Sequence, residues 1–277
     1  RGAAVRGSPL RGAGEGEGGP TTPEAVPAVI LARGGLRVLL KPPGWTVSVA
    51  GGGQSSSEEL EWQRDATAGP PLQDWLAEEF GPAHPIALDA DLSHGLLHRL
   101  DRQTSGALAW APDYEGYFAA RVQFASLRVL KEYVCLCGGW LDPKPQLIEV
   151  PLREARQRLG APQSVADPLG RRACTEVLHV HHLLGPDAVS LSLAAVRLHT
   201  GRLHQIRAHL GGLGHPLLGD TAYGGEAPSW CPRILLHAQR LVLEAGGGPA
   251  DARAPWPQDL LGVCSLLAAA EGCRARA

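Results

Sequence analysis

The feature that most constrains the fold of this chain is a nine-residue stretch, His98 to Gly106, that runs directly into an apolar segment. The stretch reads HRLDRQTSG and places one carboxylate, Asp101, between two arginines. Its last three residues are small, which allows another backbone or a ligand to come close. The apolar run from Ala107 to Ala111 predicts a buried strand. We therefore expect Asp101 on a loop that a rigid strand holds in place.

Hydrophobic periodicity along the chain predicts strands mixed with short helices. The expected strands cover residues 29–31, 36–40, 131–136, 173–184 and 188–198, and the expected helices cover 70–80, 113–125, 201–213 and 259–270. Thr200 is predicted to cap the third helix. Residues 142–172, which are rich in Pro and Arg, are expected to form an exposed loop region. Hairpin-linked strands with few helices indicate an α+β fold around a mostly antiparallel sheet flanked by short helices and loops.

We expect one main domain over 29–271. Residues 1–28 are expected to be a disordered leader, 50–70 a flexible acidic insertion, and 272–277 a tail. The chain starts at Arg1 and contains no Met, so we expect the native N-terminus and any targeting peptide to be missing. Six widely spaced cysteines without a CxxC pair favour reduced thiols and an intracellular protein, with the compartment left open.

Charge is distributed unevenly along the sequence. The chain has a net charge of −2, but residues 97–207 hold fourteen Lys/Arg against ten Asp/Glu. Residues 42–96 hold one Arg against nine Asp/Glu. The half with the positive excess also contains the stretch around Asp101. This pattern suits a locally positive groove for RNA, although so small an excess would not indicate RNA by itself.

Six short blocks, in one order, resemble the active-site motifs of a known family. They are KPPG at 41–44, HRLDRQTSG at 98–106, KEY at 131–133, TGRLHQIRAHL at 200–210, GHPLLGDTAYG at 214–224 and LLHA at 235–238. On these blocks the chain resembles the RluA-type pseudouridine synthases. A single block could be chance, whereas six in order are specific.

The resemblance implies an isomerase that converts uridine in RNA to pseudouridine, as a monomer and without metal or other cofactor. In that reaction the uracil leaves the ribose at N1 and rejoins it through C5. The resemblance assigns the attacking carboxylate to Asp101, with C1′ and C6 both left open as its target. It places Tyr133 beside the flipped base, where it helps to move a proton. It also assigns Arg207 as the cation that keeps Asp101 ionised, through a charge-assisted and bidentate contact.

The same blocks imply contacts with the RNA. Arg99 is expected to fill the space that the flipped base leaves. Arg202, at the expected helix start, is a natural phosphate contact, and Lys41 is a weaker second one. The other expected RNA contacts are Arg102, Thr104, His204 and Gln205.

Three other interpretations were weighed. An isolated Arg-x-Asp-Arg is most often a weak surface ion pair. A metal site could use His199, His204 and His209, but on a helix the last two would point about 140° apart, and HExxH is absent. A nonenzymatic RNA-binding protein of the same fold would not require the carboxylate of Asp101. The target RNA, whether ribosomal, transfer or messenger, stays open.

Overall fold

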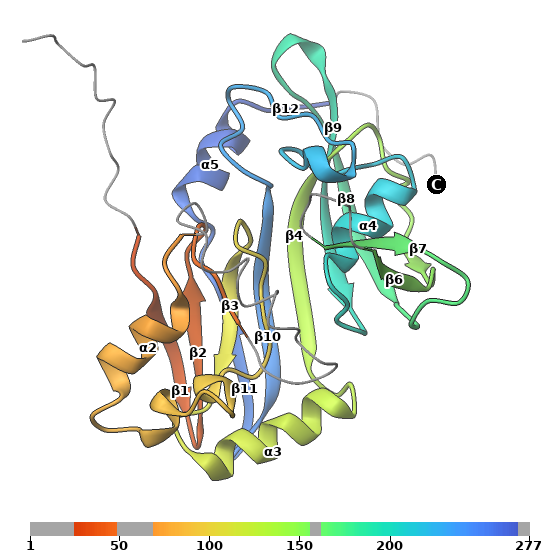
Figure 1. Cartoon of the computed structure of the whole chain (residues 1–277). Coiled ribbons are helices and arrows are strands. Elements are labelled where there is room, and N and C mark those ends of the chain that lie inside the picture. Colours follow the sequence, from red (N-terminus) through yellow and green to blue (C-terminus); the bar gives the residue numbers. More distant parts are fainter. Residues whose placement is uncertain (1–24, 49–68, 156–161, 271–277) are drawn as a thin grey trace, which may run out of the picture.

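The computed structural model describes residues 25–48, 69–155 and 162–270. In these ranges one sheet of ten strands has the order β1-β2-β3-β10-β4-β9-β8-β12, with β11 beside β10 and β5 beside β8 (Figure 1). The strands are β1 (Ala28–Arg33), β2 (Leu36–Lys41), β3 (Ser105–Trp110), β4 (Leu130–Gly138), β5 (Gln146–Ile148), β8 (Thr175–Leu184), β9 (Ser190–Leu198), β10 (Leu236–Ala245), β11 (Gly248–Arg253) and β12 (Ala268–Ala269). A separate pair joins β6 (Leu152–Ala155) to β7 (Gln163–Ala166). The α-helices are α2 (Leu72–Phe80), α3 (Tyr114–Ala125), α4 (Gln205–Gly212) and α5 (Gln258–Ser265).

The predicted α+β class is confirmed, because the strands of the large sheet pair antiparallel except for one parallel pair. There β3 runs parallel to β10 in the centre of the sheet, with Ser105 opposite His237 and Gly106 opposite Ala238. Gly106 has a φ of +120°, and a Cβ at this position would lie 2.3 Å from the carbonyl oxygen of Ala238. The predicted close approach of a second backbone is therefore present. It brings the end of the Asp101 loop against β10.

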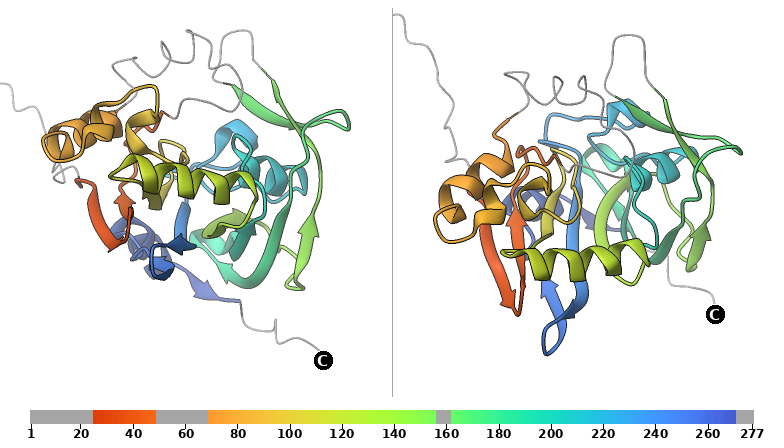
Figure 2. Two further views of the ribbon diagram at one scale, coloured as in Figure 1. Left: turned by 90° about the horizontal axis from the view of Figure 1, so that it is seen from below. Right: turned by 60° about the horizontal axis from the view of Figure 1, so that its bottom comes forward.

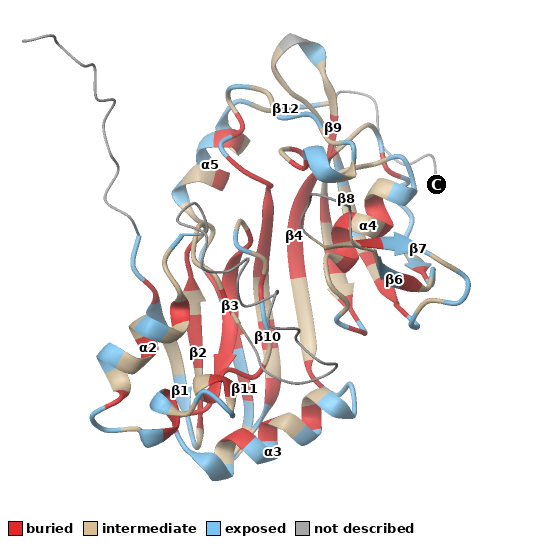
Figure 3. Ribbon diagram, in the orientation of Figure 1, coloured by how far each residue is buried: buried red, intermediate tan, exposed pale blue. Residues whose placement is uncertain are grey.

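Side chains of β4 alternate between two layers of the core. Tyr133, Cys135 and Cys137 belong to the cluster that also contains Ile206 of α4. Val134 and Leu136 point the other way, into a cluster with Leu260 and Val263 of α5. The helix α5 thus covers the sheet face opposite to α4, and Figure 2 shows it apart from α2, α3 and α4. The central strand β3 is buried along its whole length, and residues 236–238 of β10 and 133–137 of β4 are buried as well (Figure 3). These strands form a rigid base for the loops at their ends.

Most predicted elements are confirmed within a few residues. The helix expected at 113–125 is α3, and Asp113 caps it by accepting a hydrogen bond from the Gly116 N–H at 2.8 Å. The strands expected at 173–184 and 188–198 are β8 and β9, joined by a 3-10 turn at Pro186–Ala188. No helix in the described part of the chain is long and apolar enough to cross a membrane.

Four predictions of local structure were wrong or incomplete. The region 142–172 is not one loop, since it contains β5, β6 and β7. The helix expected from residue 201 begins at Gln205 with His204 as its cap, because Thr200 uses its hydroxyl to bind the Gln205 side chain. The last helix ends at Ser265, and the hairpin of β10 and β11 was not predicted. The expected leader, insertion and tail lie largely outside the described residues.

Candidate active site

Asp101 lines a cleft of about 700 Å³ and stands on the loop that leads into β3. Its side chain is 20% exposed, and its carbonyl oxygen accepts a hydrogen bond from the Thr104 N–H at 2.9 Å. The walls come from this loop, the end of α3, the start of β4 and the segment that leads into α4. The predicted position of Asp101, on a loop held by a buried strand, is confirmed.

The described residues that line the cleft include six Lys and Arg side chains and one carboxylate. The cations are Arg99, Arg121, Lys131, Arg171, Arg202 and Arg207, and the carboxylate is Asp101. Burial, and then the charge of Arg202, lower the pKa of Lys131 to about 8, so this lysine is still charged at neutral pH. Such a concentration of positive charge attracts a polyanion, and the attraction is stronger in a cleft than on a flat surface.

Arg207 joins Asp101 to a second, buried acid. Its Nη1 lies 3.3 Å from Oδ2 of Asp101, so the predicted pairing with Asp101 is present. The bidentate contact, however, is made with Asp220, at 2.7 and 2.9 Å, and the side chain of Asp220 is fully buried. The expectation of a bidentate contact with Asp101 was therefore wrong. Asp220 stands in the GHPLLGDTAYG block, which we had matched without giving its acid a role.

His204 and Tyr223 complete the wall around Arg207. His204 has a φ of +50°, and its Nε2 lies 3.8 Å from Oδ2 of Asp101. Its Nδ1 lies 3.2 Å from the Tyr223 hydroxyl, which also accepts a hydrogen bond from the Ser164 N–H. The guanidinium of Arg207 stands over the Tyr223 ring at 5.0 Å, within range of a cation–π contact. Burial lowers the pKa of His204, so its imidazole is neutral at neutral pH.

Tyr133 reaches the cleft from β4, the strand that lies next to β10. Only 6% of the residue is exposed. Burial, and then the negative charge of Asp101, raise the pKa of its phenol well above the ordinary value. The hydroxyl therefore keeps its proton at neutral pH and can donate a hydrogen bond to a bound base.

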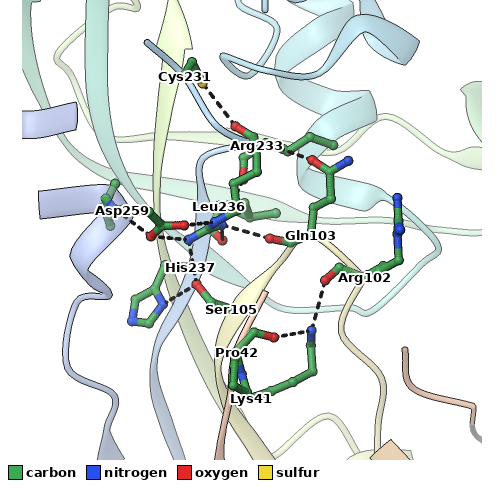
Figure 4. Close-up of polar contacts among 12 residues, drawn as sticks. Lys41, Pro42, Arg102, Gln103, Ser105, Cys231, Arg233, Leu236, His237 and Asp259 are labelled. Atoms are coloured by element: carbon green, nitrogen blue, oxygen red, sulfur yellow. Dashed lines mark hydrogen bonds and ion pairs between the residues drawn. The ribbon is translucent and has the colours of Figure 1, made fainter. Parts of the chain in front are cut away.

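Lys41 is not on the surface of the cleft, so the predicted phosphate contact was wrong. It is completely buried, and its ammonium donates to the carbonyl oxygens of Pro42 and Arg102 at 2.9 and 3.2 Å (Figure 4). It also donates to the Trp45 carbonyl oxygen at 2.9 Å. Arg102 directly follows Asp101 in the chain. Lys41 thus holds the Asp101 loop from the protein interior and is not accessible to a ligand in the cleft.

Arg233 holds the same loop one residue further on and was missed in the sequence. Its Nη1 donates to the carbonyl oxygen of Gln103 at 2.8 Å, and its Nη2 donates to the Ser105 hydroxyl at 3.0 Å (Figure 4). Asp259 at the start of α5 pairs with the guanidinium at 2.5 and 3.1 Å. The hydroxyl of Ser105 also lies 2.9 Å from Nδ1 of His237. No motif signal marked Arg233, because it precedes the LLHA block.

The remaining predicted RNA contacts separate into inner and outer residues. Gln205 is only 2% exposed, and both ends of its amide bind within the protein, to the Thr200 hydroxyl, the Arg202 N–H, the Cys174 carbonyl oxygen and the Thr175 hydroxyl. The structure therefore gives it a scaffolding role. Thr104 is buried at the edge of the cleft, whereas Arg99 and Arg102 are exposed. Arg202 lines the cleft and is oriented by the Arg172 carbonyl oxygen at 2.9 Å.

The three histidines that we weighed as metal ligands have separate partners. His199 Nε2 lies 2.9 Å from Glu176, and His209 is held between the Thr175 hydroxyl and the Val150 carbonyl oxygen. His204 faces Asp101 instead. Within the described residues, no group of three His, Cys, Asp or Glu side chains could hold a metal ion.

Comparison with known proteins supports the resemblance noted in the sequence. A family model described as RNA pseudouridylate synthase matches residues 36–211, which include Asp101, Tyr133 and Arg207. An uncharacterized RNA pseudouridine synthase of Bacillus subtilis is 34% identical over 170 residues, covering 61% of this chain and 54% of its own length. A ribosomal large subunit pseudouridine synthase D of Zymomonas mobilis is 31% identical over 186 residues, covering 62% and 56%.

The fold is also similar to a solved structure. Human RNA pseudouridylate synthase domain containing 1 superposes with a TM-score of 0.63 and 23% identity, covering 86% of each chain. At this identity the likeness concerns the fold alone. The present chain spans about half the length of the first curated relatives that it matches.

Proposed function

We propose that this chain, which belongs to the RluA-type RNA pseudouridylate synthase family, converts uridine to pseudouridine in RNA with Asp101 as the attacking carboxylate. One observation carries the proposal. Among the described residues that line the cleft, Asp101 is the one carboxylate beside six Lys and Arg side chains. A cleft that only bound RNA would be weakened by a negative charge in its lining, because the charge repels phosphate. A carboxylate in this place is better explained by chemistry.

Binding of the substrate would use the outer cations first. The RNA backbone would lie along the positive walls, and the target nucleotide would leave the stack to reach Asp101. Flipping a base costs a few kcal/mol. Arg99 is exposed at the rim, two residues before Asp101, and can occupy the vacated space. Phosphate contacts from Arg121, Arg171 and Arg202 would offset the cost of unstacking.

The chemical step would begin at the carboxylate. In one route Asp101 attacks C1′, the N1–C1′ bond breaks, and its electron pair goes to the uracil. In the other route the carboxylate adds to C6 of the base. In the first route C5 then attacks C1′ and displaces the carboxylate of Asp101. In the second route the N1–C1′ bond breaks, C5 bonds to C1′, and the carboxylate leaves C6. In both, C5 loses its proton and N1 takes one up, so the overall reaction is an isomerisation. The phenol of Tyr133 keeps its proton at neutral pH and would donate a hydrogen bond to the uracil beside Asp101.

The choice of RNA and the cellular setting follow from weaker support. The Zymomonas mobilis relative is named for the large ribosomal subunit, which makes ribosomal RNA a first candidate beside transfer and messenger RNA. We propose an intracellular enzyme that acts as a monomer. The five cysteines in the described ranges are free thiols, as expected of a reducing compartment.

The test uses RNA labelled with tritium at C5 of uridine and EDTA throughout. Wild-type protein should release tritium as C5 loses its proton, and Asp101→Asn should release none while it binds the RNA with similar affinity. Equal release by both proteins would exclude Asp101 as the attacking group. Binding without release by either protein, on unmodified total RNA of the source organism, would favour a nonenzymatic RNA-binding protein.

A further inference from the structure

Three buried cations surround the Asp101 loop, and two of them are paired directly with acids. Arg207 is held by Asp220 at 2.7 and 2.9 Å, and Arg233 is held by Asp259 at 2.5 and 3.1 Å. The third cation is Lys41, which is completely buried at the end of β2. Its neighbours therefore decide whether its charge is balanced.

The hydrogen bonds of Lys41 go to neutral groups. An ammonium has three N–H donors, and those of Lys41 point to the carbonyl oxygens of Pro42, Trp45 and Arg102. Carbonyl oxygens solvate the charge without cancelling it. A buried charge without an opposite charge nearby is strongly destabilising. The acid that completes the set must therefore act through space.

Asp101 is that acid. Among the described residues, the one arginine or lysine that forms an ion pair with Asp101 is Arg207, at 3.3 Å, and Arg207 already shares its charge with Asp220. Burial lowers the pKa of Lys41 to about 7, the charge of Asp101 raises it, and Arg233 and Arg102 lower it. The attraction between two charges is mutual, so the ammonium attracts the carboxylate as strongly as the carboxylate attracts the ammonium.

We propose that Lys41 is a positioning residue for Asp101, which fixes the catalytic loop through the Arg102 carbonyl and supplies the counter-charge that Arg207 gives only in part. The proposal rests on the role of Asp101 in the proposed function. Because Lys41 is fully buried, it acts on the carboxylate from the protein interior and has no contact with the RNA. It therefore affects the chemical step and not the affinity for substrate.

Two substitutions separate the charge of Lys41 from its hydrogen bonds. Lys41→Gln keeps N–H donors for the carbonyl oxygens and removes the charge, whereas Lys41→Met removes both. Gln123→Leu is a matched control. Gln123 of α3 is also buried, and its amide binds the backbone N–H and carbonyl oxygen of Glu244 in β10. It carries no charge and lies outside the cleft. Thermal melts identify the variants that fold, and Lys41→Gln carries the test if Lys41→Met does not.

The first measurement needs no RNA and no activity. Amide hydrogen exchange follows the Asp101 loop through the N–H groups of Gly44 and Thr104, which donate to the carbonyl oxygens of Arg102 and Asp101. In Lys41→Met, and to a smaller extent in Lys41→Gln, these amides should exchange faster than in wild type, because the Arg102 carbonyl oxygen loses the ammonium that holds it. In Gln123→Leu they should exchange as in wild type. Unchanged exchange in both Lys41 variants would overturn the proposal, whether or not the protein proves to be a pseudouridine synthase.

The second measurement compares single-turnover tritium release and RNA affinity between pH 6 and pH 9. At pH 6 both Lys41 variants should be at least about tenfold slower than wild type, with unchanged Kd. The difference should shrink above pH 8, because the wild-type ammonium itself loses its proton as the pH rises past about 7. A Lys41→Gln variant as fast as wild type at every pH, or a weakened Kd in either variant, would overturn the proposal. Wild-type protein that releases no tritium would instead contradict the proposed function.

Discussion

Individual residues around Asp101 are arranged so that charge is concentrated at one point of the cleft. Arg207 binds Asp220 with two hydrogen bonds and keeps one nitrogen for Asp101. The planar guanidinium can make these contacts at once, whereas a lysine has a single compact charge. Asp220 therefore orients Arg207, and Arg207 in turn fixes the carboxylate of Asp101.

Replacement of Arg207 by lysine should retain the charge and lose this geometry. We expect Arg207→Lys to lower the single-turnover rate by about 10- to 100-fold, because one charge-assisted hydrogen bond contributes about 1.5–3 kcal/mol. Arg153→Lys is the control, since Arg153 is an exposed arginine on β6 that also pairs with one carboxylate, that of Asp167. The rates are compared by tritium release under saturating protein. A wild-type rate in Arg207→Lys would show that the paired hydrogen bonds of the guanidinium are unimportant.

Among the elements, the parallel pairing of β3 with β10 determines where the Asp101 loop can lie. The two backbones come close at Gly106, next to the point where Arg233 and Ser105 connect the loop to α5. Strands, loop and helix thus meet within a few residues. This arrangement explains why the small residues after Asp101 matter for folding as well as for access to the cleft.

A side chain at Gly106 should prevent this close pairing of β3 with β10. Gly106→Ala would place a Cβ 2.3–2.7 Å from the backbone of Ala238, at a φ of +120°. We expect a loss of more than about 3 kcal/mol in the free energy of unfolding, well above the usual effect of a substitution. Gly44→Ala separates strain from collision, since Gly44 has a φ of +90° with open space around it, and should cost only about 1–2 kcal/mol. Urea denaturation measures both, and equal losses would contradict the collision.

The residues that line the cleft could be predicted from the sequence better than the buried groups that hold them in place. The loop of Asp101, the helix α3 and the strands β8 and β9 carry local signals such as a cap, an apolar run or a hairpin turn. The pairing of β3 with β10 is nonlocal, and the buried roles of Lys41 and Arg233 depend on it. A conspicuous lysine in a motif looks like a phosphate contact until the fold shows that it is buried. The register of strands that are far apart in the sequence, and the burial that results from their pairing, cannot be predicted from a local sequence pattern.

Across the whole molecule, stability should fall in mild acid because histidines are buried in neutral form. His237 Nδ1 accepts from the Ser105 hydroxyl, and its Nε2–H faces the Ala254 carbonyl oxygen at 3.4 Å. Burial is the main cause that lowers its pKa to about 4. The unfolded chain takes up the proton near pH 6.5 and the folded chain only near pH 4. Stability from this residue is thus complete above about pH 6.5 and is lost as the pH falls toward 4.

The expected loss from His237 is about 3 kcal/mol between pH 7 and pH 4. Urea denaturation at several pH values measures it, with His237→Asn as the comparison, because its amide oxygen can still accept from Ser105. The variant should lose less stability over this range than the wild type does. The same slope in both proteins would show that His237 does not cause the acid sensitivity.

The measurement that tests the central claim most directly is the nucleoside composition of RNA after incubation with the protein. The RNA is digested to nucleosides, and uridine and pseudouridine are separated and counted. With wild-type protein, pseudouridine should appear in an amount equal to the uridine that is lost. With Asp101→Asn, no pseudouridine should form although the RNA stays bound. Pseudouridine made by Asp101→Asn at the wild-type rate, or none made by the wild type, would contradict the account.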